Sequence, residues 1–187
     1  MVNSRAGSGR LSVDDWIQAG YAIMADGGIE TLKIDRLCAR LGVTKGSFYW
    51  HFKDMAGYRA ALVEAWAELG DRDRSHFREL GRLAPRERLA RMMTSLLGER
   101  QWMLERAMRE WARTEPAVAA SVRTADERVL AAVRQTFVDA GFDAEDAEMR
   151  ANATFAAGVG FLHLWDTPPG SRMVAQRERF LDLMMAD

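Results

Sequence analysis

The chain has 187 residues, of which 48% are hydrophobic, and its formal net charge of −1 excludes a strongly basic protein. This length suffices for one sizeable core, or for a small domain joined to a larger one. A single cysteine, Cys38, excludes an internal disulfide, and no apolar run approaches the roughly 20 residues of a membrane span. We therefore expect a globular protein of the cytoplasm.

The first 30 residues predict a tail followed by one helix. Residues 1–10 are polar and rich in glycine and serine, which is typical of a disordered segment. The alternative is a basic arm that uses Arg5 and Arg10 to contact phosphates. A helix is expected to begin after Ser12, which pairs with Asp15 as a capping box, and to end at Gly27-Gly28.

Two short helices joined by a tight turn are predicted between Ile34 and Lys53. In the first, apolar residues recur at the helical positions i, i+3, i+4 and i+7. Gly42 ends it, because glycine adopts the left-handed backbone that a sharp turn needs. Thr44 is the expected N-cap of the second helix, in which Phe48 and Phe52 share an inward face.

The outward face of that second helix is cationic, hydroxylic and aromatic. This arrangement is the helix-turn-helix plan, in which the second helix enters a DNA major groove. Residues 31–53 hold five basic groups and one acidic group, whereas residues 54–187 hold 19 basic and 22 acidic groups. A local basic patch on a nearly neutral chain favours a protein that binds DNA selectively.

The run from Gly42 to Lys53, GVTKGSFYWHFK, resembles the recognition-helix signature of the TetR-type transcriptional repressors, and its Tyr-x-His-Phe core is specific. The resemblance is strong over residues 11–66. In the rest of the chain it rests mainly on the helix layout, together with residues 110–116, EWARTEP, which look like a subgroup of the family.

The resemblance implies a set of DNA contacts, with two departures from the family pattern. Lys33 stands where a small hydroxyl residue usually caps the helix and touches a phosphate, and Thr31 is the alternative cap. Met55 replaces a lysine that commonly holds a phosphate, and Arg59 is the expected substitute. The residues expected to contact DNA are Lys33, Thr44, Lys45, Gly46, Ser47, Tyr49, Trp50, His51 and Lys53.

The remaining periodicity predicts an all-α fold of about nine helices, with no alternating strand pattern and no repeat. Asp54 is expected to cap a long helix that reaches about Leu80. We expect two domains. Residues 1–53 form an N-terminal arm and helix-turn-helix domain, and residues 54–187 form a helical ligand-binding and dimerisation domain in which residues 54–80 are the connecting helix.

Methionine and tryptophan concentrate between residues 92 and 111. Such side chains make adaptable walls for an apolar ligand, although methionine at helical spacing is also typical of an ordinary core. The resemblance implies a ligand cavity in this domain. Its expected lining is Trp66, Met92, Met93, Leu96, Trp102, Met103, Met108, Trp111 and Phe155.

Small residues at 151–160 permit close packing of the last two helices. The resemblance implies that these helices pair across a two-fold axis as a four-helix bundle. Two recognition helices then lie about 34–36 Å apart and read a pseudo-palindrome. The expected interface consists of Phe155, Gly158, Phe161, Leu162, Trp165, Phe180, Leu181 and Met184.

The expected function is a dimeric repressor that binds a double-stranded DNA operator and is released by a small apolar or amphipathic molecule. The alternative is a TetR-like activator, or a regulator controlled by a partner without such a ligand. An enzyme is not expected, because the sequence has no paired Cys/His ligands, phosphate loop or Gly-x-Ser-x-Gly motif. No cofactor, metal site or membrane contact is expected. A nonspecific architectural protein would need more cations than this motif holds.

Overall fold

The computed structural model describes residues 11–96, 98–165 and 170–186, apart from the side chains of 69–79, 96, 99, 100 and 171–175. The predicted tail, with Arg5 and Arg10, and the side chain of Leu96 lie outside this description. The described chain is entirely helical, so the all-α prediction of about nine helices is confirmed. Its helices are α1 (Val13–Gly27), a 3-10 turn (Ile29–Thr31), α2 (Ile34–Leu41), α3 (Lys45–His51), α4 (Met55–Leu80), α5 (Pro85–Leu96), α6 (Glu99–Ala112), α7 (Pro116–Asp139), α8 (Ala144–Leu164) and α9 (Ser171–Met184).

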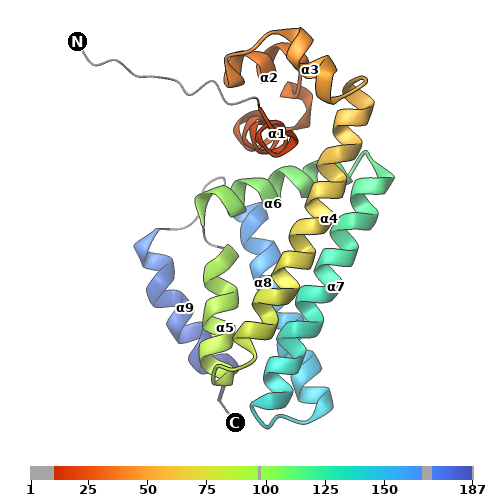
Figure 1. Ribbon diagram of the computed structural model, residues 1–187. Helices are drawn as coiled ribbons and strands as arrows, with labels where there is room; N and C mark the ends of the chain where they lie inside the picture. Colours follow the sequence, from red (N-terminus) through yellow and green to blue (C-terminus); the bar gives the residue numbers. More distant parts are fainter. Residues whose placement is uncertain (1–10, 97, 166–169, 187) are drawn as a thin grey trace, which may run out of the picture.

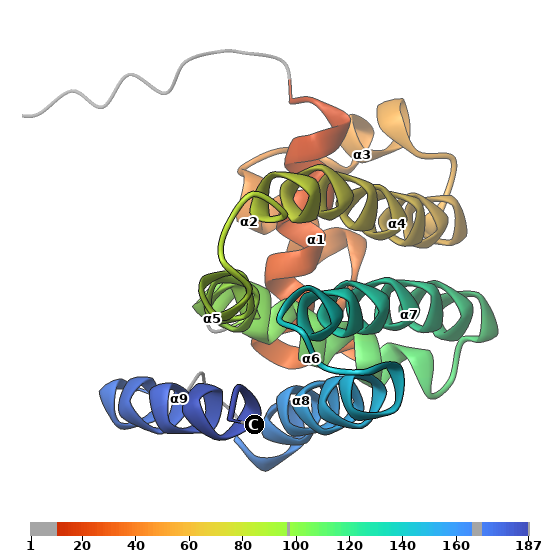
Figure 2. The same cartoon turned by 90° about the horizontal axis from the view of Figure 1, so that it is seen from below.

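The helices form a small head on a layered body (Figure 1). Helices α1, α2 and α3 make the head, and α4 runs from it down the length of the body beside α7. Helix α6 crosses beneath the head and packs on α1. Seen from below, α4 lies on one side, α8 and α9 form the opposite layer, and α5, α6 and α7 lie between them (Figure 2).

The caps follow the sequence at three helix starts. The Ser12 hydroxyl accepts from the Asp15 amide at 3.2 Å and donates to the Asp15 carboxylate at 2.7 Å, which lowers the pKa of Asp15. Asp54 accepts from the amide of Gly57 at 2.8 Å, and Asp143 accepts from that of Asp146 at 2.9 Å. Each cap satisfies an amide that has no partner within its helix.

One predicted cap lacks its hydrogen bond, and one alternative cap is wrong. Thr44 occupies the N-cap position of α3, but its side chain makes no capping hydrogen bond. Thr31 does not cap α2 either, because its hydroxyl bonds to the carbonyls of Ile23 and Gly28 at the end of α1. Helix α2 therefore begins after Lys33 without a side-chain cap.

One hydrophobic core joins the head to the body. Trp16, Phe48 and Tyr58 of the head region belong to the same buried cluster as Leu104 and Met108 of α6. A second cluster fills the lower body and includes residues of α5, α7, α8 and α9. The division at residue 53 stays a prediction, but no gap in packing separates the head from α6.

Two buried tyrosines join α1 to α4. The Tyr58 hydroxyl donates to the Trp16 carbonyl at 2.7 Å, and the Tyr21 hydroxyl donates to the Leu62 carbonyl at 2.7 Å. A hydrogen bond between buried groups is costly to break, because both partners are left unsatisfied. Gly20 makes the crossing possible, since a Cβ atom there would lie 2.1 Å from the Tyr58 hydroxyl oxygen.

Gly20→Ala is therefore expected to displace Tyr58 and to lower the free energy of unfolding by about 2–4 kcal/mol. Gly57→Ala is the matched control on α4, because its Cβ meets only an ordinary contact at 3.5 Å. That variant should stay within about 1 kcal/mol of the parent. Urea unfolding measures both, and equal stabilities of the two variants would contradict the tight crossing.

Candidate nucleic-acid interface

The turn between α2 and α3 has the predicted geometry. Gly42 adopts a left-handed backbone, with φ 68° and ψ 32°, and an L side chain there would be strained. The amide of Val43 donates to the Cys38 carbonyl at 3.0 Å, which closes the end of α2. Helix α3 has seven residues and is therefore about 10 Å long.

The inner face of α3 is fixed by aromatic packing. Phe48 is fully buried, and its ring meets the Trp16 ring edge-on at 5.5 Å between centroids. Phe52 packs against Tyr58 at 4.8 Å in the same edge-on manner. These contacts hold α3 rigidly on α1 and α4, so its opposite face has a fixed orientation.

The opposite face of α3 presents two large aromatic side chains to solvent. Tyr49 is 56% exposed and Trp50 is 70% exposed. Burying an aromatic side chain stabilises a protein strongly, so two exposed ones on one short helix indicate a binding surface. Most of the other predicted contacts lie exposed with them, namely Lys33, Thr44, Lys45, Gly46 and Lys53, whereas Ser47 is half-buried.

His51 lies differently from the other predicted contacts. It is half-buried, and its ring stands 6.2 Å from the Trp16 ring and 6.1 Å from that of Phe52. Its ring therefore packs partly against the head. Its prediction as a DNA contact rests on the part of the side chain that stays accessible.

Two cations of the head are held by neighbouring carboxylates. Lys45 lies 2.6 Å from Asp35, across the two helices of the motif, and Arg40 lies 3.0 Å from Asp26. The hydrogen bond that Lys45 donates to Asp35 and the negative charge of Asp35 raise the pKa of Lys45, which stays protonated. Within the described residues, Lys33, Arg36 and Lys53 form no ion pair.

Sequence reasoning missed Arg36 and Tyr58. Arg36 lies exposed on α2, and its charge was counted in the basic patch but not assigned to a contact. Tyr58 is fully buried and sets the angle between α4 and the head. No local pattern in the sequence indicates its hydrogen-bond partner, which lies 42 residues away.

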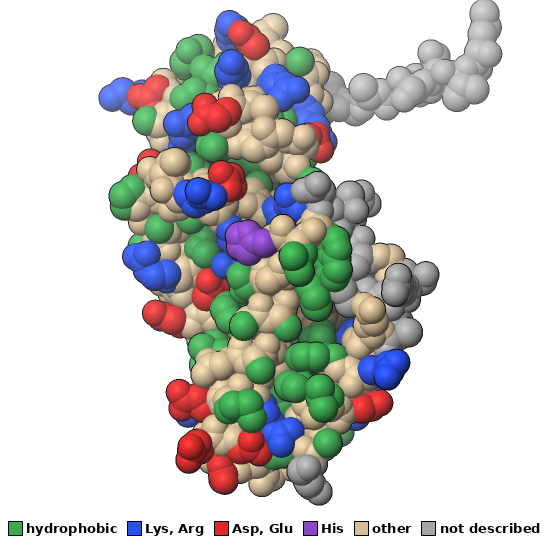
Figure 3. All heavy atoms as spheres, turned by 180° about the vertical axis from the view of Figure 1, so that it is seen from behind, with side chains coloured by type: hydrophobic (Ala, Val, Ile, Leu, Met, Phe, Trp, Pro, Cys, Tyr) green, Lys and Arg blue, Asp and Glu red, His purple; other side chains and the backbone are tan. Residues whose placement is uncertain are grey.

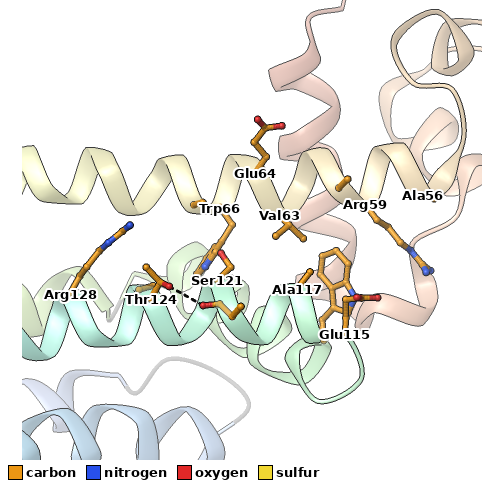
Figure 4. A pocket seen from close by; sticks show the side chains of 15 residues that line it. Ala56, Arg59, Val63, Glu64, Trp66, Glu115, Ala117, Ser121, Thr124 and Arg128 are labelled. Atoms are coloured by element: carbon orange, nitrogen blue, oxygen red, sulfur yellow. Dashed lines mark hydrogen bonds between the residues drawn. The ribbon is translucent and has the colours of Figure 1, made fainter.

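A groove of about 730 Å³ lies between α4 and α7, close to the head (Figure 4). Trp66 and Trp111 from the predicted pocket line it. Most of the other predicted pocket residues do not. Met92 and Met108 are buried in the two core clusters and Trp102 is fully buried, whereas Met93, Met103 and Phe155 are half-buried outside the groove.

The predicted dimer face divides into inward and outward residues. Leu162 is 2% exposed and Leu181 is fully buried, so both belong to the interior of the subunit and are removed from the predicted interface. The other six are half-buried or exposed: Phe155, Gly158, Phe161, Trp165, Phe180 and Met184. Leu164 and Leu183, which were not predicted, are the most exposed leucines among the side chains that the structure describes, at 70% and 65%.

The match to a family model decides the nature of the head. Residues 17–62 match the model described as bacterial regulatory proteins of the tetR family. The chain carries the DNA-binding domain of the TetR family. This match covers α1, α2, α3 and the first part of α4, which are the elements that hold Tyr49 and Trp50 outward.

Solved structures show that the whole chain has the fold of TetR-family regulators. A transcriptional regulator from Rhodococcus sp. RHA1 has a TM-score of 0.71, with 20% identity over 94% of both chains. A TetR-like regulator from the same source has a TM-score of 0.62 and 20% identity, over 92% of this chain and 90% of that one. The fatty acid degradation regulator FadR from Bacillus halodurans has a TM-score of 0.60 and 13% identity, over 94% and 98%. A comparison with curated proteins finds no match.

Membrane-spanning helices and metal-binding clusters were also sought among the described residues. None of the helices described is long and apolar enough to cross a membrane. No group of three or more His, Cys, Asp or Glu side chains in this part of the chain is placed to hold a metal ion.

Tyr49→Ala is expected to weaken binding to a selected operator about ten-fold, because an exposed aromatic side chain is lost from the recognition helix. Its effect on stability should be small, since Tyr49 is 56% exposed. Tyr49→Phe separates the ring from the hydroxyl. Electrophoretic mobility shifts measure the affinity, and unchanged binding by the alanine variant would remove Tyr49 from the interface.

Lys53→Ala is expected to weaken binding to every DNA sequence about five-fold at ~0.15 M salt and to reduce the salt slope by about one. Arg134→Ala is the matched control, because Arg134 is exposed on α7 in the body. Affinity at several salt concentrations measures the slope. A change in sequence preference without a change in slope would show that Lys53 contacts a base instead of a phosphate.

Proposed function

We propose that the protein is a dimeric transcriptional repressor that binds a pseudo-palindromic operator and releases it when a small molecule binds the body. The observation that carries this proposal is the exposure of Tyr49 and Trp50 on the second helix of a TetR-family DNA-binding domain. The proposal includes a cytoplasmic location and no enzymatic activity.

The DNA contact would be made by the face of α3 that carries Tyr49 and Trp50. A helix about 10 Å long fits the major groove, which is about 12 Å wide. Tyr49 and Trp50 are suited to thymine methyl groups and sugars, because their faces are apolar and their edges carry polar groups. Lys33 and Lys53 are suited to phosphates on either side.

The dimer would form through α8 and α9. Figure 3 shows hydrophobic side chains gathered on the face of the body that these helices make. Leu164, Trp165 and Leu183 are exposed, and the Phe161 and Trp165 rings stack at 4.9 Å. A second copy of the chain is the proposed partner, because a two-fold axis through this layer leaves both heads free for DNA.

Release would act through α4. This helix forms one wall of the groove, and it is tied to α1 of the head by Tyr58 and by the carbonyl of Leu62. The end of α8 is also connected towards the head, because Arg106 of α6 donates a hydrogen bond to the Trp165 carbonyl. A 100-fold loss of operator affinity needs only about 2.7 kcal/mol of coupling between the two sites.

Selection of bound fragments from the source genome, at ~0.15 M salt, tests the central claim. A single pseudo-palindrome next to a few genes would support a specific regulator and would indicate candidate ligands. Those ligands are then tested for release of the selected fragment. Fragments without a common sequence would contradict operator recognition, and equal binding with and without every candidate would favour an activator or a partner-controlled regulator.

Leu164→Glu is expected to convert the dimer into monomers, because it places a charge in an apolar contact that is repeated by symmetry. Val138→Glu is the control, since Val138 is a 41% exposed hydrophobic residue on α7. Sedimentation measures the molecular mass of each variant. If Leu164→Glu stays dimeric, the interface does not include this end of α8.

A further inference from the structure

We propose that the groove between α4 and α7 binds a neutral, flat molecule that presents a hydrogen-bond acceptor to Trp66 and Ser121. This inference rests on the proposed function only in taking the molecule to be the one that releases DNA. The site itself follows from the shape of the groove, from two unpartnered donors within it and from the distribution of charge along it.

Small side chains on two facing helices leave the space. A volume of about 730 Å³ lies within the range of about 300–1,000 Å³ that is typical of small-molecule sites. Helices that present alanine to each other usually approach closely, whereas the large ring of Trp66 stands between these two. The result is a slot with smooth walls that suits a flat ligand. Its alanines are Ala56, Ala60 and Ala67 of α4 and Ala117, Ala120 and Ala125 of α7.

Two buried polar atoms of the groove have no partner. Trp66 is only 6% exposed, and its indole nitrogen makes no hydrogen bond within the described chain. The Ser121 hydroxyl is likewise buried without a partner. Figure 4 shows Trp66 extending from α4 towards α7, where Ser121 lies. A buried donor left unsatisfied costs about 1–3 kcal/mol, and native proteins keep few of them.

The chemistry of these donors defines the ligand group. The indole N–H only donates, so its partner must be an acceptor. The Ser121 hydroxyl can rotate to donate to the same atom. A carbonyl oxygen has two lone pairs and can accept from both, whereas a hydrocarbon leaves both donors unsatisfied.

The charges of the groove favour a neutral ligand. Figure 4 shows Arg59 and Arg128 at opposite ends, with Glu115 near the Arg59 end. Glu64 points away from α7. Glu64 belongs to the lining of the middle section, but the lining side chains that lie between α4 and α7 around Trp66 are uncharged. An ionic ligand placed there would lose its hydration without meeting a counter-charge.

The groove also lies where a ligand can act on the head. Ala56, Arg59 and Ala60 belong to the first turns of α4, and Tyr58 in the same turns is bonded to the Trp16 carbonyl. A molecule inserted between α4 and α7 therefore pushes on the segment that orients α1 and α3.

Indole signals in 15N-labelled full-length protein provide the test. Two probes of similar shape are compared, 2-acetylnaphthalene with a carbonyl acceptor and 2-ethylnaphthalene without one. Trp66→Phe assigns the Trp66 signal by its loss and keeps an aromatic ring in place. We expect 2-acetylnaphthalene to move this signal in a saturable manner and to bind about two- to ten-fold more tightly than 2-ethylnaphthalene.

Variants of the walls distinguish the groove from other sites. Ser121→Ala should remove part of the preference for the ketone and leave the affinity for the hydrocarbon unchanged. Ala120→Phe should fill the slot and abolish binding of both probes. Ala131→Phe is the matched control, because Ala131 is exposed on the same helix outside the groove.

Three results would overturn the proposal. These are a Trp66 signal that does not move with either probe up to its solubility limit, equal affinity for the two probes, and full binding by Ala120→Phe. The experiment contains no DNA, so its failure is separate from failure of the repressor proposal. A confirmed site whose occupation leaves DNA binding unchanged would refute ligand release and leave the site in place.

Discussion

The crossing of α1 and α4 determines how the rest of the molecule is arranged. Two buried hydroxyls bond across it, from Tyr58 to the Trp16 carbonyl and from Tyr21 to the Leu62 carbonyl, each at 2.7 Å. Burial raises the pKa of both tyrosines, so they stay protonated and remain donors. Gly20 allows the close approach. Phe48 and Phe52 then pack on this joint, and their positions fix the direction in which Tyr49 and Trp50 point.

Because α1 and α4 are bonded and packed together in this way, the head and the body share one hydrophobic core. The core runs without interruption from Trp16 through Tyr58 to Leu104 and Met108 of α6, so bending at the start of α4 would open a packed core. Movement of the head should therefore follow movement of α4 as a whole. Helix α4 has 26 residues and is about 39 Å long, so a tilt of about 5° displaces its end by about 3 Å. In a symmetric dimer both heads shift, which is significant against a spacing of about 34–36 Å.

The features that could be predicted from the sequence are those set by neighbouring residues, such as helix caps and turns. The capping box at Ser12, the cap at Asp54 and the left-handed Gly42 all depend on residues a few positions apart. The groove could not be predicted, because it depends on how alanines about 60 residues apart face each other. Periodicity also identified Met92, Trp102 and Met108 as inward-facing, but it could not distinguish a packed core from a cavity wall. The prediction that Leu162 and Leu181 lie in the dimer interface was wrong for a similar reason. A helix can have one apolar face towards its own subunit and another towards a partner, and periodicity does not distinguish the two.

The charges of the head bear on how selective its DNA binding can be. Arg40 and Lys45 are already paired with Asp26 and Asp35, and exposed pairs of this kind stabilise the fold by only about 0–1 kcal/mol. Their larger effect is on DNA, because a phosphate must compete with a carboxylate for each cation. Few cations remain for nonspecific attraction, and the chain as a whole carries a net charge of −1. In the proposed repressor, tight binding would come from DNA contacts of Tyr49 and Trp50 and from joining two heads in one dimer, and both of these would depend on the DNA sequence.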